Sequence, residues 1–595
     1  MQPFFTSPLH AWQGRAAWHL LDTEFGHGER FLAAWAAWQA DPQRCTLLHV
    51  TGITDGTTHP AQVLANADPA WAPLAQALAQ QLHGLLPGVH RLSFAQGRVV
   101  LTLWVGDMHS LLRQQSSVAD ALWLSPSFAV DAHSIKALAR HCQRGTVVHS
   151  TARSAPLQQA LQSGGFVLEA PSCDAAATSA RFDPHWEPRT RNAQPTWARA
   201  PGHALVIGAG LAGAATAYSL ALRGWQVTVL AAGDAPADGA SGLPAGLFCP
   251  HVSPDDSVLS RLSRNGVRMT LQRLRDVCQE GQDWGHSGVL EHCTDGGTGL
   301  PADWATGVGA QWSHATTPQQ LHDAGLNADT TACWHAQAGW VRPAQLVQAQ
   351  LRHPHITFQG AAHVARLQRN ARGQWQALDA HGAVLAQADL AILACGPSTN
   401  ALLPTHTPWK LQALRGQVTW GVHSAHNDAA LPPFPVNGNG NLVTHVPSDE
   451  GRIWVMGSTF ERDVDAMPIS EQDQIAAHAV NFDKLSTLLP ASAAPLKPWF
   501  TPGDAHCQPT WGRVRIASHD RLPIAGPVGS DTPKLWALTA MGARGLTLSV
   551  LCGELIAAQL HGEPLPLDAK LAQHLGTERL ARQAASAAPS AEQNP

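Results

Sequence analysis

The stretch ALVIGAGLAGAATAYSLALRGWQVTVL, residues 204–230, decides the fold of the larger part of this chain. It reads as a strand, a glycine turn, a helix and a second strand. Gly208, Gly210 and Gly213 have the spacing GxGxxG between the first strand and the helix. The first glycine permits the tight turn, the second lets the backbone approach a pyrophosphate, and the third lets helix and strand pack closely. The pattern predicts a dinucleotide-binding βαβ unit with the pyrophosphate at the helix N-terminus.

The acid that binds the ribose in such units is expected at the end of the second strand, roughly 20 residues further on. Ala231 occupies that place, and Asp234 is the nearest carboxylate. Either Asp234 reaches the ribose or the contact is made differently. The substitution weakens a nicotinamide assignment more than a flavin assignment, because FAD enzymes hold their cofactor with a second, distant segment.

A second segment with the same logic begins with RLPIAGPVG at Arg521 and continues with LWALTAMGARGLTLSVLCGELIAAQL at Leu535. Gly542 and Gly545 open its turn, and the helix that follows would direct its N-terminus at an electron-rich ring. A flavin needs such a positive end near its pyrimidine oxygens, where negative charge gathers on reduction. The two glycine segments together predict an FAD site.

Three further segments complete a resemblance: ASGLPAGLFCP at Ala240, GWVRPAQL at Gly339 and AILACGPSTN at Ala391. Over most of residues 204–572 the chain resembles the D-amino-acid-oxidase-like family of FAD amine oxidoreductases. The resemblance implies an α/β fold in which an FAD Rossmann domain carries an antiparallel-sheet substrate domain. It also implies oxidation of a C–N bond by hydride transfer to the flavin, followed by hydrolysis of the imine.

The first zone, residues 1 to about 168, alternates strand-like and helical runs, which predicts a largely parallel α/β sheet. A glycine turn at Gly26 and Gly28 is suited to the amino acid end of S-adenosylmethionine. Asp107 ends a later strand, where methyltransferases commonly place an acid near the adenine. Ahead of the oxidase, these features resemble the bifunctional tRNA 5-methylaminomethyl-2-thiouridine biosynthesis proteins, the MnmC family.

This resemblance implies a methyltransferase-like Rossmann domain over residues 1–170, a linker over 171–203, the FAD oxidoreductase domain over 204–572 and a disordered tail over 573–595. It implies FAD and S-adenosylmethionine as cofactors and the wobble uridine of tRNA as substrate. The oxidoreductase would remove the carboxymethyl group from 5-carboxymethylaminomethyl(-2-thio)uridine, and the methyltransferase would methylate the resulting amine. Arg515 and Arg544 are the implied anchors for the substrate carboxylate, because a guanidinium binds it in two places. A structural ion pair is the alternative for each, and no catalytic base is identified.

The first domain departs from the family pattern where the chemistry is carried. Glu29 and Arg30 stand where the family has Asn after the glycine loop, Thr54 replaces the ribose-binding glutamate, and Ser125 replaces the aspartate that is the candidate base. Losing the ribose carboxylate removes charge-assisted hydrogen bonds of roughly 1.5–3 kcal/mol, and serine alone does not accept a proton from an amine at neutral pH. We expect a domain that folds but no longer methylates.

Composition sets further limits. The net charge of −5 gives no general attraction to nucleic acid. The ten cysteines lie singly, as in a reduced cytoplasmic protein, and no metal site or membrane segment is expected. The densest basic run lies in SRLSRNGVRMTLQRLRD, where an arginine row faces either a phosphate backbone or solvent; its members are Arg261, Arg264, Arg268 and Arg275. Two other functions stay open: an FAD-dependent oxidase of a free amino acid or N-alkyl glycine, and a non-catalytic tRNA-binding protein.

Overall fold

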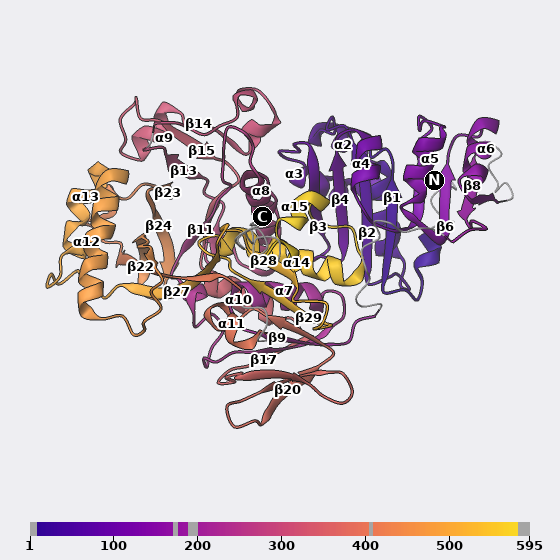
Figure 1. The fold of residues 1–595 in the computed structure, drawn as a ribbon. Helices are drawn as coiled ribbons and strands as arrows, with labels where there is room; N and C mark the ends of the chain where they lie inside the picture. The colour runs from indigo at the N-terminus through magenta and orange to yellow at the C-terminus, as the bar shows by residue number, and fades with distance from the viewer. Residues whose placement is uncertain (1–8, 170–176, 188–199, 295, 404–408, 581–595) are drawn as a thin grey trace, which may run out of the picture. The chain divides into compact units, whose positions relative to one another are not determined.

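The computed structural model describes residues 9–169, 177–187, 200–294, 296–403 and 409–580 (Figure 1). The chain forms two compact units. The first unit comprises residues 1–201 together with 557–572, and the second comprises residues 202–556 together with 573–595. Each unit is described by itself.

The first unit is built on an eight-stranded sheet with the order β3-β4-β2-β1-β5-β6-β8-β7. Strands β4, β2, β1, β5 and β6 are parallel, whereas β3 and β8 join them antiparallel. The carboxyl ends of the parallel strands meet at one edge, where the loops with the predicted methyl-donor residues begin. The strands are β1 (Ala17–Asp22), β2 (Leu47–Thr54), β3 (Gly88–Phe94), β4 (Val99–Val105), β5 (Ala119–Leu124), β6 (Cys142–Ser150), β7 (Phe166–Leu168) and β8 (Thr178–Phe182).

Helices cover both faces of this sheet, and each face has its own apolar core. Leu20 and Val50 lie in one core, with residues of α1 and α3, whereas Leu21 and Ile53 lie in the other, with residues of α4, α5 and α6. Successive strand residues point to opposite faces, so a parallel sheet buried on both sides needs continuous apolar strands. The helices are α1 (Glu29–Ala40), α2 (Pro60–Asn66), α3 (Ala72–Gln81), α4 (Met108–Gln114), α5 (Ala132–Ala139) and α6 (Ala155–Ser163).

Strand β8 lies within the segment that the sequence suggested as a linker. It pairs antiparallel with β6 and β7 and buries Thr178, Ala180 and Phe182 on one side. The alternation of buried and exposed residues in β8 spans only five residues, and the strand is stabilised by its pairing with β6 and β7, which the local sequence pattern does not show.

The second unit contains a six-stranded sheet with the order β17-β10-β9-β21-β29-β28. All its strands are parallel except β28, which pairs antiparallel with β29. The two glycine segments of the sequence leave this sheet from β9 and β29. The strands are β9 (His203–Ile207), β10 (Gln226–Leu230), β17 (Ile356–Gln359), β21 (Leu390–Leu393), β28 (Ile524–Pro527) and β29 (Leu535–Thr539).

Three helices of this unit approach one another at glycines. A Cβ added at Gly553 of α14 (Gly545–His561) would lie 2.8 Å from the backbone of Ala215 in α7 (Leu211–Ala221). A Cβ at Gly266 of α8 (Val258–Val277) would overlap the carbonyl oxygen of Thr547 in α14. Only glycine allows these close backbone contacts. The remaining helices of this unit are α9 (Pro318–Asp323), α10 (Pro343–Leu351), α11 (Thr399–Leu402), α12 (Glu471–Leu488) and α13 (Pro490–Leu496). Helix α15 (Ala569–Gln573) belongs to the first unit up to residue 572.

The second unit also contains a nine-stranded, mainly antiparallel sheet. Its strand order is β14-β15-β13-β23-β24-β25-β22-β26, and β27 pairs with β22. Helices α12 and α13 pack on it (Figure 1), and Leu485 and Leu488 share a core with Trp454 and Met456. This is the antiparallel-sheet part that the sequence predicted. Its strands are β13 (Val289–His292), β14 (Ser313–Ala315), β15 (Ala332–His335), β22 (Leu411–Val422), β23 (Val436–Gly438), β24 (Gly440–Ser448), β25 (Gly451–Gly457), β26 (Glu461–Arg462) and β27 (Trp511–Ser518).

Two small three-stranded sheets complete the second unit. One comprises β11 (Gly246–Phe248), β12 (Trp284–Gly285) and β16 (Gly339–Val341), and the other comprises β18 (Arg366–Arg369), β19 (Trp375–Leu378) and β20 (Val384–Ala388).

The start of the expected disordered tail is ordered. Arg579 is buried and forms an ion pair with Asp520 at 2.9 Å, and the hydroxyl of Thr577 donates a hydrogen bond to the carbonyl of Pro527. Residues 581–595 lie outside the described residues. Among the residues described, every cysteine is free, and none of the helices has both the length and the apolar character that crossing a bilayer requires.

Candidate active site

The first glycine turn has the geometry that its sequence predicts. Gly208 has φ +111°, and a Cβ there would overlap the carbonyl oxygen of Ala394 at the end of the neighbouring β21. A Cβ at Gly213 would overlap the carbonyl oxygen of Gly208, so the helix and the turn are in direct backbone contact. Both positions therefore require glycine.

The N-terminus of α7 is open to a ligand. Its N-cap is Gly210, which has no side chain, and the amide of Leu211 donates to the hydroxyl of Ser241 at 3.0 Å. The unpaired amides and the helix dipole give this end a partial positive charge, which suits a pyrophosphate.

The second turn leads into α14. Gly542 has φ +54°, and its amide donates to the carbonyl of Ile516 in β27 at 2.9 Å. Gly545 is the first residue of α14. This hydrogen bond ties the second glycine turn to the antiparallel sheet, so residues of β27 are carried to the same place.

A cavity of about 640 Å³ joins these segments. Of the predicted site residues, Gly208, Gly210, Gly542, Gly545 and Arg515 line it, whereas Gly213, Asp234 and Arg544 are not among its lining residues. Gly213 instead packs against the backbone of Gly208, which lines the cavity.

The predicted ribose ligand, Asp234, is exposed and is not a lining residue, whereas Asp238, four residues later, and Asp465 do line the cavity. Ala231 lines the cavity at the end of β10, where a ribose-binding acid is usual. Sequence spacing alone does not say which of the two acids after β10, Asp234 or Asp238, lines the cavity.

These features fit a flavin dinucleotide. The cavity has two glycine turns, two helix N-termini and walls from a parallel sheet and an antiparallel sheet. One helix end serves the pyrophosphate, and the other lies where the sequence predicted the flavin ring.

Arg515 lies in β27 and is the cation of the predicted pair that lines the cavity. Its guanidinium donates to Ser458 Oγ at 3.3 Å and to the Thr459 carbonyl at 3.5 Å. Burial lowers the pKa of Arg515. Within the described residues it forms no ion pair, which argues against the alternative of a structural ion pair.

Arg544 is half-buried between the two glycines of the second turn. Burial, and next the charge of Arg521, lower its pKa. The pKa of His251 is lowered by burial first and then by the charge of Arg544.

A cluster that sequence reasoning missed lies beside α14. The Cys249 amide donates to the hydroxyl of Thr547 at 3.4 Å. Glu291 and His335 form a hydrogen-bonded ion pair at 2.9 Å, and Ser313 Oγ lies 2.7 Å from His335 Nδ1. Burial raises the pKa of Glu291, but the hydrogen bond from His335 and its charge bring it below its usual range.

The ligand atoms of Cys249, Glu291 and His335 lie within 4.8 Å of one another, a spacing compatible with a metal ion. Glu291 and His335 are hydrogen-bonded to each other, and the Cys249 thiol donates to the Pro250 carbonyl at 3.5 Å. These contacts account for the arrangement without an ion, and the expectation of no metal stays a prediction. Each residue comes from a different strand or loop, so no sequence spacing announces the cluster.

The arginine row of α8 is divided: Arg264 and Arg268 are buried, whereas Arg261 is half-buried and Arg275 is exposed, so a solvated face describes only part of the row. Arg264 is buried and pairs with Asp256 at 2.6 Å. Arg268 is 1% exposed and stacks over Trp312, and burial lowers its pKa to about 9. Helix α8 lies inside the unit against α14, and helical spacing does not distinguish a buried polar face from an exposed one.

In the first unit, Gly26 (φ +55°) and Gly28 (φ +88°) form the predicted turn between β1 and α1. Asp107 is the N-cap of α4, and its carboxylate accepts from the Ser110 amide at 2.8 Å. These hydrogen bonds to Ser110 lower the pKa of Asp107. Asp107 thus has a capping role in the described structure, beside the strand end where Thr54 stands.

Arg30 crosses the glycine turn. It donates to Asp22 at 2.8 Å and to the Glu24 carbonyl at 2.9 Å. Burial raises the pKa of Asp22 to about 7, against the charge of Arg30, which lowers it. The acid at the end of β1 is therefore already paired.

Ser125 has a carboxylate partner that the sequence did not suggest. Its hydroxyl donates to the carboxylate of Glu24 and lies 2.7 Å from Ser127 Oγ. Glu24, which follows β1 and lies 101 residues before Ser125, thus supplies a carboxylate close to the position of the replaced aspartate. Thr54, by contrast, lies 3.1 Å from Thr58 Oγ1, with no acid in the ribose position.

Residues 203–559 match the family described as FAD dependent oxidoreductase, and residues 69–173 match the S-adenosyl-L-methionine-dependent methyltransferases. The turn at Gly26 and Gly28 lies before the second match. Fold, cavity and families define an enzyme that joins an FAD-dependent oxidoreductase to a methyltransferase domain, and its predicted fold class and its cofactors, FAD and S-adenosylmethionine, are confirmed at that level.

The chain is 52% identical over 603 residues to the tRNA 5-methylaminomethyl-2-thiouridine biosynthesis bifunctional protein MnmC of Delftia acidovorans, covering 96% of this chain and 93% of that protein. It is 49% identical over 596 residues to the protein of the same name from Acidovorax sp., covering 96% and 92%. The chain belongs to the MnmC family. Among solved structures it is similar to glycine oxidase from Bacillus cereus, at 18% identity and a TM-score of 0.47, over 62% of this chain and 98% of that one.

Proposed function

We propose that the second unit acts on the wobble uridine of tRNA and converts its 5-carboxymethylaminomethyl group to 5-aminomethyl. The relatives are named for the biosynthesis of a tRNA 5-methylaminomethyl-2-thiouridine. The observation that carries the proposal is that Arg515, a carboxylate-binding side chain with no acidic partner among the described residues, lines the same cavity as both glycine turns.

In this proposal Arg515 binds the carboxylate of the substrate. A guanidinium forms two parallel hydrogen bonds to a carboxylate, and these hold the adjoining methylene in one orientation. Arg544 adds a second positive charge at the start of α14. Both cations favour the ionised carboxylate inside the unit, where an unpaired charge would be costly.

The reaction balances with water as the second reactant. When bound, FAD accepts a hydride from the methylene carbon between the nitrogen and the carboxylate. The nitrogen loses a proton as the C=N bond forms, and water then adds to that carbon. The C–N bond breaks, leaving the primary amine on the uridine and releasing a two-carbon oxoacid.

For the first unit we propose that methylation is lost or strongly weakened, and that the cause lies in donor binding. Arg30 already pairs with Asp22, and Thr54 offers no carboxylate to the ribose hydroxyls. Because Glu24 places a carboxylate beside Ser125, the loss of the base weighs less in this proposal than the loss of donor-binding groups. We further propose that the protein works in the cytoplasm, where tRNA is the substrate.

A free amino acid or N-alkyl glycine is the second candidate substrate. The net charge of −5 favours it, and so does the burial of Arg264 and Arg268, which takes two of the four arginines of the α8 row away from a phosphate backbone.

The deciding experiment is nucleoside analysis of tRNA from a deletion strain, complemented with the wild-type chain or with Arg515→Ala. We expect carboxymethylaminomethyl uridine to accumulate in the deletion strain and in the variant. An unchanged profile in the deletion strain would favour the free-amine oxidase instead.

A further inference from the structure

An exposed aromatic ring lies beside Arg515, which lines the flavin cavity. Phe460 follows β25, in the loop that leads to α12, and is 52% exposed. Asp465 and Met467 of the same loop line the cavity, and Met467 is 42% exposed. Large apolar side chains at the mouth of a cavity are typical of a binding surface.

Two cations accompany the ring. Arg515 Cζ lies 4.8 Å and Lys484 Nζ lies 5.3 Å from the ring centroid of Phe460. Lys484 donates to the Ser458 carbonyl at 2.6 Å, and Arg515 donates to Ser458 Oγ. Both cations are thus held beside the ring by Ser458, and with both in place the ring is still 52% exposed, which leaves surface for a ligand.

Neither cation has an acidic partner among the described residues. Burial, and then the charge of Arg515, lower the pKa of Lys484. Two unpaired positive charges beside an aromatic face are complementary to a base with its phosphate.

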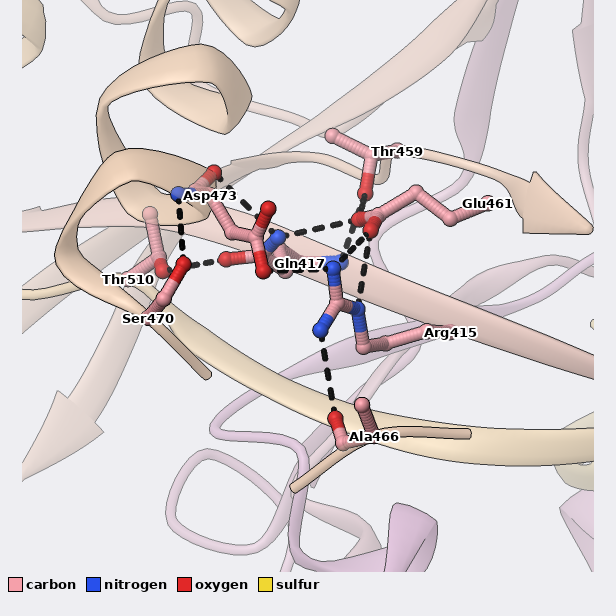
Figure 2. A network of polar contacts seen from close by, with 8 residues as sticks. All are labelled: Arg415, Gln417, Thr459, Glu461, Ala466, Ser470, Asp473 and Thr510. Atoms are coloured by element: carbon pink, nitrogen blue, oxygen red, sulfur yellow. Dashed lines mark hydrogen bonds and ion pairs between the residues drawn. The ribbon is translucent and has the colours of Figure 1, made fainter. Parts of the chain in front are cut away.

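A polar network fixes the loop on both sides of the ring (Figure 2). Arg415 is buried and binds Glu461 at 2.8 Å, the Ala466 carbonyl at 3.1 Å and Asp473 at 2.9 Å. Gln417 donates to Glu461 at 2.9 Å. The residue directly after Phe460 is thus held to β22, while the ring itself is 52% exposed.

The geometry points to a nucleobase platform. We propose that the uracil ring bearing the reacting side chain stacks on Phe460, and that Lys484 binds an adjacent phosphate. This rests on the proposed function, with the substrate carboxylate on Arg515. The chain from that carboxylate to the uracil ring spans roughly 6 Å at bond lengths of about 1.5 Å, which reaches the ring beside Arg515.

The platform would let a chain with a net charge of −5 recognise tRNA through one stacked base and one phosphate contact. It also selects a nucleotide over a free N-alkyl glycine, which has no ring to stack.

The test uses the full-length, FAD-loaded protein and an anticodon stem–loop RNA that carries 5-carboxymethylaminomethyluridine. Phe460→Ala is expected to raise KM about ten- to hundred-fold, the range for losing one base–aromatic stack, with kcat within about twofold of wild type. Phe460→Trp is expected to retain the wild-type KM, and Phe460→Leu to resemble the alanine variant. Ile475→Ala, at an exposed apolar position of α12, is the matched control and is expected to have no effect.

Lys484→Gln separates the phosphate contact from the stack. We expect a higher KM for the RNA, an unchanged KM for the free nucleoside, and a salt dependence of binding that is shallower by about 0.7, the slope for one single-strand phosphate. A Phe460→Ala variant that matches Ile475→Ala, or a Phe460→Leu variant that matches wild type, would overturn the platform. If the yellow wild-type protein does not oxidise the RNA at all, the proposed function fails, and the platform fails with it.

Discussion

A Cβ atom at Gly213 would overlap the carbonyl oxygen of Gly208, so a substitution there is felt directly in the turn that faces the cavity. We expect Gly213→Ala to raise the dissociation constant for FAD at least about tenfold, or ~1.4 kcal/mol, because the turn must shift to relieve the overlap. Flavin absorbance per mole of purified chain measures it. Gly297→Ala is the control, since a Cβ there meets nothing within 4 Å. Equal flavin content in both variants would contradict the assignment.

Arg515 tests the substrate side of the same cavity. Replacing it with alanine removes a two-point charged contact, and we expect kcat/KM to fall about a hundredfold, or ~3 kcal/mol, with FAD retained. Arg515→Lys keeps the charge but not the planar fork, and should recover only part of the loss. Steady-state kinetics with the modified RNA measures both variants, with exposed Arg366→Ala as control. A lysine variant at full activity would show that charge alone suffices.

At the scale of elements, α14 is joined to α7 and α8 by one buried acid. Glu554 binds Arg223 at 3.1 Å and Arg273 at 3.4 Å. Burial alone would raise the pKa of Glu554, but the charges of the two arginines lower it to about 2. A folded pKa below the unfolded value means that the ionised form stabilises the fold above about pH 4.3, the value for a free glutamate. That stabilisation is lost as the pH falls toward 2.

Glu554→Gln should therefore destabilise the flavin unit by ~3–5 kcal/mol near neutral pH, because two buried guanidinium groups lose their counter-charge. The release of flavin fluorescence on heating follows this unit in the intact chain. We expect the variant to have a flatter dependence of unfolding temperature on acid pH than wild type. Parallel curves with a constant offset would mean that Glu554 stabilises by packing and not by charge.

How far the sequence predicts these elements depends on the range of the interactions involved. The turns at Gly208 and Gly542 were predictable, because steric limits on φ act within a few residues. The burial of Arg268 was not, since the apolar and aromatic groups around it belong to other elements. The pair Glu24–Ser125 joins two strands that lie side by side only after folding. Phe460 has no local signal, and only its place beside Arg515 in the folded chain marks it.

At the scale of the whole molecule, the two units preserve their family chemistry unequally. The second unit has its glycine turns, its cavity and Arg515, the proposed carboxylate anchor. The first unit has the strand order and the turn of a methyltransferase. However, Arg30 forms an ion pair with Asp22, and Thr54 stands where the ribose-binding acid is expected. In the proposed function the second unit makes the amine that the first unit would methylate. A weakened first unit therefore leaves the 5-aminomethyl group as the end product.

We therefore expect the full-length protein, given the modified RNA and S-adenosylmethionine, to form the primary amine and no methylated product, and calorimetry to detect no micromolar binding of S-adenosylmethionine. The double variant Arg30→Asn, Thr54→Glu frees the acid of β1 and supplies a ribose carboxylate, which should tighten binding about ten- to hundredfold, the worth of roughly 1.5–3 kcal/mol of charge-assisted hydrogen bonding. Mass spectrometry of the digested RNA distinguishes the amine from its methylated form. A methylated product from the wild-type chain would show that Glu24 and Ser125 suffice, and that donor binding tolerates the paired Asp22.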